Sequence, residues 1–100
     1  MNKSSDIKKL IEYPKEGILS KELAKTSRSN ITLFCMAKGT EMGEHTSTKE
    51  GFIYILEGEG TFNLEGKEIK IMPGVFIFMR KGAPHSLSAK KDTSFLLSLC

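Results

Sequence analysis

The chain holds two histidines, His45 and His85, and each follows closely on a glycine. A neutral imidazole can offer one ring nitrogen to a divalent first-row transition metal, to an organic ligand or to a proton in transfer. A lone histidine is more often a hydrogen-bonded structural residue, so the chemistry depends on whether the fold brings the two rings together. The stretch 39–85 alternates short apolar runs with Gly, Pro and Glu/Lys turns. We expect the fold of this stretch to bring the two histidine rings together.

Other catalytic arrangements are not evident in the sequence. Cys35 lies on an expected strand with no histidine beside it, so no Cys-His pair stands out. The turn at 57–60 contains glycine but is acidic, and it would repel a phosphate group. Cys35 and Cys100 do not make a disulfide framework, and we expect a core thiol and a tail thiol. The histidine pair is therefore the candidate site.

Short apolar runs bounded by turn residues predict about eight to nine β-strands. The runs are residues 18–24, 31–37, 52–56, 61–64, 68–71, 75–79, 85–89 and 94–99. The run 52–56 is apolar throughout, which predicts a strand buried on both faces or curled into a barrel wall. About half of the aromatic and methionine side chains on these strands should face the interior, because side chains alternate along a strand.

The N-terminal segment is expected to be an arm. Ser5 or Asp6 can cap a short helix over residues 5–12, and Pro14 and Gly17 end any regular structure after it. We expect residues 1–29 to form this arm and a first strand that pack on the main domain. Residues 30–100 should form that domain.

Closely spaced short strands with turn chemistry at almost every junction predict an all-β fold rather than alternating helix and strand. A chain of 100 residues makes one domain of this kind. We expect a small β-barrel, because a barrel removes exposed strand edges and gives the two histidines an interior to share.

The spacing of the glycines around the two histidines resembles the cupin family, whose small barrels carry two signature stretches on facing strands. The positions that match the family offsets are Gly39, His45, Gly58, Gly74, Gly82 and His85. The resemblance covers about residues 30–99 and implies a single-domain barrel of the cupin 2 type, a jelly roll or double-stranded β-helix.

The resemblance also implies a metal site, a divalent first-row transition metal held by three histidines and one glutamate. Ser47 stands at the second histidine position and Gly51 at the glutamate position, with Glu50 one place earlier. A one-residue offset points Glu50 to the opposite face of its strand unless a β-bulge shifts the register. The metal shell is therefore expected to be degenerate, with His45, His85 and Glu50 as candidate ligands.

We expect a ligand pocket centred on the two histidines and lined by His45, Ser47, Tyr54 and His85. The leading hypothesis is a cupin that binds a small molecule of unknown identity. The alternative is a metal-dependent cupin enzyme of the dioxygenase or isomerase class, which uses the two histidines with a carboxylate or water. A third hypothesis is a sensory or interaction module that works as a homodimer, since small cupins commonly pair through their sheets.

Composition predicts no nucleic-acid or membrane partner. Basic residues are scattered singly or in pairs such as Lys8/Lys9 and Lys90/Lys91, without the basic stripe and interleaved aromatics of a nucleic-acid surface. No apolar run approaches the roughly 20 residues that span a bilayer, and the N-terminal sequence lacks a secretory signal. The expected location is the cytoplasm.

Overall fold

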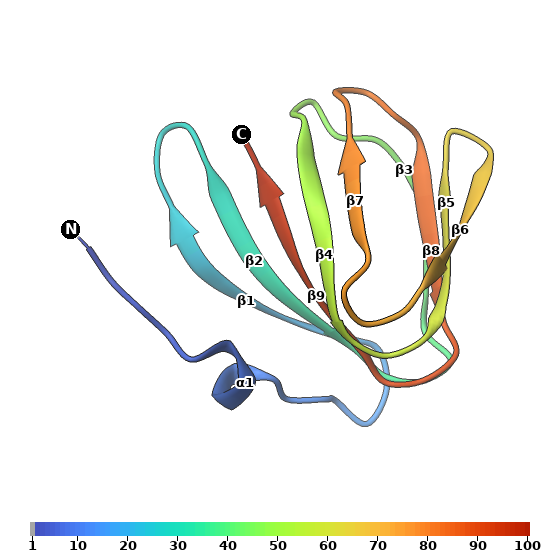
Figure 1. The fold of residues 1–100 in the computed structure, drawn as a ribbon, viewed down its shortest axis with the longest axis horizontal. Helices are drawn as coiled ribbons and strands as arrows, with labels where there is room; N and C mark the ends of the chain where they lie inside the picture. Colours follow the sequence, from blue (N-terminus) through green and yellow to red (C-terminus); the bar gives the residue numbers. More distant parts are fainter. Residues whose placement is uncertain (1) are drawn as a thin grey trace.

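The computed structural model describes residues 2–100 and arranges their strands in two antiparallel sheets that face each other (Figure 1). The first sheet has five strands in the order β1 (Ile18–Lys25), β2 (Asn30–Met36), β9 (Thr93–Leu99), β4 (Gly51–Glu57) and β7 (Phe76–Met79). The second has four, in the order β3 (Glu41–His45), β8 (His85–Ala89), β5 (Gly60–Leu64) and β6 (Lys67–Ile71). This is the all-β jelly roll that the sequence predicted.

The hydrophobic core lies between the two sheets. Phe62 from one sheet and Phe95 from the other are almost completely buried, and Phe95 stacks on Phe34 with ring centroids 5.2 Å apart. Along β4, β7 and β8 every second side chain is buried, as pleated backbone requires. The other buried members of the core are Met36, Ile53, Ile55, Ile71, Ile77, Met79, Leu87 and Ala89.

Strand β4 is a wall strand, the second of the two arrangements that its apolar run predicted. Ile53 and Ile55 are buried with exposed fractions of 3% and 1%, whereas Tyr54 between them is 39% exposed. The strand is therefore buried on one face, although its sequence is apolar on both. The reason is that this part of the outer face of the five-stranded sheet is open to solvent.

Strand β3 was absent from the predicted runs. Its sequence Glu-Met-Gly-Glu-His has no β-branched residue and only one apolar side chain, so it lacks the pattern of a strand. It forms at the edge of the four-stranded sheet because β8 supplies its hydrogen-bonding partner. Most of its side chains are exposed, which explains the polar composition.

The N-terminal arm packs on the outer face of the five-stranded sheet. Its helix α1 (Ile7–Leu10) is a single turn, shorter than expected, and the Asp6 side chain caps it. Lys21 of β1 donates from Nζ to the Leu10 carbonyl oxygen at 2.8 Å, and the Tyr13 hydroxyl lies 2.9 Å from Ser94 Oγ of β9.

This arm explains the burial of two outward-facing side chains of β2. Leu33 and Cys35 alternate with the inward Phe34, yet both are completely buried. Lys21 is the register partner of Leu33, and Ser94 is that of Cys35, so the contacts of the arm place it over both side chains. Cys35 is thus a buried thiol, as expected, and Cys100 is exposed.

Within residues 2–100 no helix is long and apolar enough to cross a membrane.

Candidate functional site

The two histidines face each other across β3 and β8. His45 and His85 are register partners, and their ring centroids lie 4.2 Å apart with an angle of 63° between the ring planes. His85 is buried, with an exposed fraction of 7%, while His45 is exposed at the rim. The fold thus brings together the only two imidazoles in the chain.

A β-bulge in β3 aims His45 at its partner. Met42 pairs with Leu87 and His45 pairs with His85, so three steps along β3 match two steps along β8. Without the extra residue, alternation would turn His45 to the opposite side from the core-packed Met42. Because of the bulge, both side chains point toward the interior.

The two rings are held in the same way. His45 Nδ1 lies 2.8 Å from the Gly43 carbonyl oxygen, and His85 Nδ1 lies 2.9 Å from the Ala83 carbonyl oxygen. A carbonyl oxygen can only accept, so Nδ1 donates in both rings and each neutral imidazole carries its proton on Nδ1. Each Nε2 atom is left with a lone pair.

An open cavity of about 410 Å³ begins at the histidine pair. It lies at the end of the fold where β3, β7 and β9 finish and β8 begins, the upper end in Figure 1. Its lining combines the two imidazoles, three hydroxyl side chains and three apolar side chains. The lining residues are His45, Thr46, Ser47, Thr48, Met79, His85, Leu97 and Leu99.

Ser47 helps to hold the rim of this cavity. Its hydroxyl oxygen accepts a hydrogen bond from the Lys49 backbone N–H at 3.1 Å. Its carbonyl oxygen accepts from the Gly82 N–H at 2.9 Å, which joins the loop after β3 to the loop after β7. The rim therefore rests on backbone hydrogen bonds between two loops.

Tyr54 and Glu50 lie outside the cavity, in contrast to the sequence expectation. Tyr54 occupies the outward position between two buried isoleucines, so its ring points away from the histidines. Glu50 is exposed and is not part of the cavity lining. Of the four expected pocket residues, the structure brings together His45, Ser47 and His85.

Leu97, Leu99, Thr46 and Thr48 line the cavity but were not among the expected site residues. The two leucines could have been found by alternation, since they lie two and four residues after the inward Phe95 on the same strand. The two threonines belong to a loop without periodicity, so the sequence carries no such signal for them.

The metal shell that the cupin resemblance implies does not fit these residues. Gly51 stands where a glutamate would be needed, and a β-carbon there would collide with the Ser98 carbonyl oxygen. Ser47 offers only a neutral hydroxyl, which is a weak ligand for such ions. Within residues 2–100 no three His, Cys, Asp or Glu side chains are grouped closely enough to hold a metal ion. The two imidazole nitrogens make up only half of the four metal ligands that the resemblance implies.

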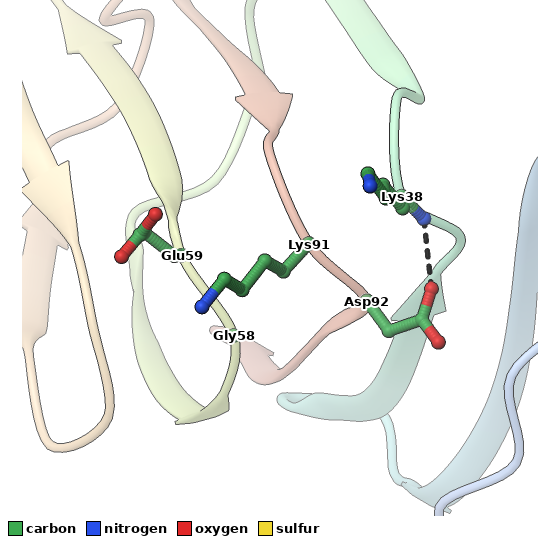
Figure 2. A pocket seen from close by; sticks show the side chains of 5 residues that line it. All are labelled: Lys38, Gly58, Glu59, Lys91 and Asp92. Carbon is green, nitrogen blue, oxygen red and sulfur yellow. Dashed lines mark hydrogen bonds between the residues drawn. The ribbon is translucent and has the colours of Figure 1, made fainter.

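A second hollow lies at the opposite end of the fold, lined by Lys38, Gly58, Glu59, Lys91 and Asp92 (Figure 2). Asp92 Oδ1 accepts a hydrogen bond from the Lys38 backbone N–H at 2.8 Å, which fastens two loops together. Two lysines and two carboxylates balance each other there. The cluster therefore has no formal net charge.

Arg80, which follows the cavity residue Met79 in the chain, pairs with a carboxylate. Its Nε and Nη2 atoms donate to Glu65 Oε1 at 3.2 and 3.0 Å. Its side chain is 75% exposed.

Two antiparallel sheets of this topology, with paired histidines at one end, define a small all-β jelly-roll protein. A profile of the cupin domain matches residues 32–100, and the chain belongs to the cupin family. A search of curated proteins found no match.

Solved structures share this fold over almost the whole chain. A conserved protein of unknown function from Streptococcus pyogenes is 27% identical, with 99% of this chain and 87% of that chain covered and a TM-score of 0.87. A cupin superfamily protein from Desulfitobacterium hafniense is 23% identical, with 99% and 91% covered and a TM-score of 0.88. A salicylate 1,2-dioxygenase variant from Pseudoaminobacter salicylatoxidans is 16% identical, with 83% and 26% covered and a TM-score of 0.78.

Proposed function

We propose that this cupin binds a small organic molecule in the cavity at His45 and His85, and that the imidazoles contact the ligand directly rather than through a tightly held metal. The observation that carries the proposal is the pair of Nε2 lone pairs directed to an open, partly apolar cavity. Ligand sites typically combine apolar walls with a few fixed polar groups.

The degenerate metal shell supports direct contact. Binding of a divalent ion needs charge and several donors, and this site supplies two neutral nitrogens. The position of the missing carboxylate is closed by the approach of Gly51 to Ser98, so a carboxylate there would require the backbone to move. A ligand of modest size has no such requirement.

The experiment is a screen of small organic compounds against the isotope-labelled protein by amide NMR. The expected result is that binders shift the amides of the cavity residues, including Thr46, Thr48 and Leu97, and that His45→Ala reduces these shifts. Ser86→Ala is the matched control, because Ser86 follows His85 on β8 but lines a groove on the other face of the sheet. The proposal fails if a broad screen yields no compound that shifts cavity amides.

The alternative is a metal-dependent enzyme of the dioxygenase or isomerase class, with His45, His85, Glu50 or water as ligands. Its support is the likeness in fold to a salicylate 1,2-dioxygenase variant. If Glu50 is a ligand, its side chain, which is exposed beside the start of β4, has to turn toward the histidines. Elemental analysis of the protein as purified distinguishes the two functions: a stoichiometric transition metal would favour the enzyme.

We further propose that the protein is a homodimer formed through the outer face of β4 and β7. Phe52 pairs with Phe78 and Tyr54 with Phe76 across these strands, and the Phe52 and Phe76 ring centroids lie 5.2 Å apart. The exposed fractions are 39% for Tyr54, 59% for Phe76 and 54% for Phe78. Thr61, Asn63, Ser86 and Ser88 make the outer face of the other sheet polar by contrast.

The area and charge of this aromatic face, defined by Phe52, Tyr54, Phe76 and Phe78, favour a second copy as its partner. An aromatic side chain presents about 150–250 Å², so the three exposed rings together offer roughly 300 Å². A stable interface needs roughly 800 Å² per partner, and this face supplies its apolar centre. Because the four side chains are uncharged, two copies can meet there without like-charge repulsion.

We also propose a cytoplasmic location, since a reducing compartment would keep the two unpaired thiols reduced.

A further inference from the structure

The shared tautomer of the two histidines restricts what can bind between them. Since Nδ1 donates to a carbonyl oxygen in both rings, each Nε2 of the neutral site can only accept a hydrogen bond. Within residues 2–100 no protein donor reaches either Nε2 atom. His85 is a buried residue, yet the described chain leaves no fully buried side-chain polar atom without a partner, so its Nε2 opens on the cavity.

The rest of the lining adds no formal charge. Thr46, Ser47 and Thr48 contribute hydroxyl groups, and Met79, Leu97 and Leu99 contribute an apolar wall. No carboxylate, ammonium or guanidinium group is part of this lining, and the histidines are its only titratable side chains. An anion would therefore meet two lone pairs and no compensating positive charge while the imidazoles are neutral.

A hydroxyl group matches both parts of this lining. It can donate its proton to an imidazole Nε2 and accept from a threonine or serine hydroxyl with its oxygen. The two rings lie close together, with their centroids 4.2 Å apart, so one molecule that carries two donors can reach both acceptors. Water alone could bridge them, but it would leave the wall of Met79, Leu97 and Leu99 exposed.

We propose that the ligand is an uncharged compound with two hydroxyl groups on neighbouring carbon atoms of an apolar body, a vicinal diol or ortho-diphenol. The two hydroxyls donate to the Nε2 atoms of His45 and His85, and the apolar body packs on the leucines and methionine of the wall. This inference rests on the proposed small-molecule function and specifies its ligand class.

The first test reads the tautomer itself. Long-range proton–nitrogen NMR correlation of the isotope-labelled histidine rings near pH 8 should show a protonated Nδ1 and an unprotonated Nε2 in both residues. An Nε2–H tautomer in either ring would overturn the inference, because that nitrogen would then be a donor.

The second test compares three probes with the same carbon chain: 1,2-hexanediol, 1-hexanol and hexanoate. We expect the diol to bind roughly tenfold more tightly than the alcohol, because it makes one more hydrogen bond to a desolvated acceptor, and hexanoate to bind most weakly.

The variants His45→Ala and Ser86→Ala complete the test. His45 is exposed, so its removal should leave the fold intact and reduce the affinity for the diol to that for the alcohol. Ser86→Ala should change neither. If hexanoate binds most tightly, the ligand class is wrong while the cavity remains a binding site. If the diol and the alcohol bind equally, the paired-acceptor inference is wrong.

Discussion

Gly51 of β4 approaches Ser98 of β9 so closely that a β-carbon at position 51 would overlap the Ser98 carbonyl oxygen. Gly51 is buried and pairs with Leu99 on one side and Met79 on the other, both of which line the histidine cavity. The close packing of the backbone thus leaves no room for a side chain at the position where the family motif carries a glutamate.

Gly51→Ala is therefore expected to destabilise the protein. The backbone of β9 would have to move, and overpacking of this kind costs about 1–3 kcal/mol. In a domain of this size each kcal/mol lowers the melting temperature by about 4–8 °C, which thermal unfolding followed by circular dichroism can resolve.

The matched control is Gly43→Ala, because a β-carbon at Gly43 meets no atom within 4 Å. It should keep or slightly raise the stability, since alanine reduces the conformational entropy of the unfolded chain. Equal stability of the two variants would show that β4 and β9 leave room for a β-carbon at position 51.

A third imidazole beside His45 and His85 should strengthen metal binding. Ser47 lines the cavity and stands at the second histidine position of the family motif. Ser47→His is expected to raise the affinity for Ni²⁺ and Zn²⁺ by at least about tenfold, since an imidazole is a far better ligand than a hydroxyl. Isothermal titration calorimetry gives the comparison directly.

The control for this gain is Thr61→His, which adds an imidazole to the outer groove of the four-stranded sheet instead of the cavity. It should leave the metal affinity at the level of the natural chain. A similar gain in both variants would mean that the added imidazoles bind metal independently of His45 and His85.

The folding stability of the protein should decrease at alkaline pH because of Tyr13 in the N-terminal arm. Its hydroxyl donates to Glu57 Oε1 at 2.7 Å. Burial raises the pKa of Tyr13 above its ordinary value near 10, and the neighbouring Glu57 carboxylate adds to this shift. A raised pKa in the folded state stabilises the protein fully below about pH 10, and this contribution is lost as the pH rises further.

Urea unfolding at about pH 8 and pH 10.5 measures this effect. Tyr13→Phe should lower the unfolding free energy by about 1 kcal/mol at pH 8, through the lost hydrogen bond, and should reduce the further loss at high pH. Tyr54→Phe is the matched control, because Tyr54 is the only other tyrosine and its side chain is exposed on β4. An unchanged alkaline loss in Tyr13→Phe would contradict the assignment.

Much of the fold could be predicted from local signals. Turn residues separate the apolar runs, and eight of the nine strands follow these runs. Strand β3 could not be predicted in this way, because its polar residues form a strand only through pairing with β8. The histidine pair was predictable from motif spacing, whereas the bulge that aims His45 depends on a register that only the folded sheet sets.

The misplaced site residues have a common cause. Tyr54 belongs to a run that is apolar at every position, so the sequence alone does not tell its inward face from its outward face. The close approach of Gly51 to Ser98 joins strands that are 47 positions apart in the chain, and no local pattern reports it. Long-range packing therefore decides which residues line the cavity.

Substitution of the aromatic face should convert the proposed dimer to a monomer. Phe78→Lys introduces a charge into the centre of the proposed interface, and its exposed ring contributes little to the fold of one subunit. Light scattering at tens of micromolar should show twice the chain mass for the natural protein and a single chain mass for the variant. Lys70→Glu, on the exposed part of β6 in the other sheet, should remain dimeric.

The most direct test of direct ligand contact is calorimetric titration of the natural protein with Zn²⁺, Ni²⁺, Mn²⁺ and Fe²⁺. Two imidazoles without a carboxylate should bind each ion more weakly than micromolar, and His45→Ala should change the heat signal little. Micromolar or tighter binding that disappears in His45→Ala would contradict the account and favour a metal-dependent cupin.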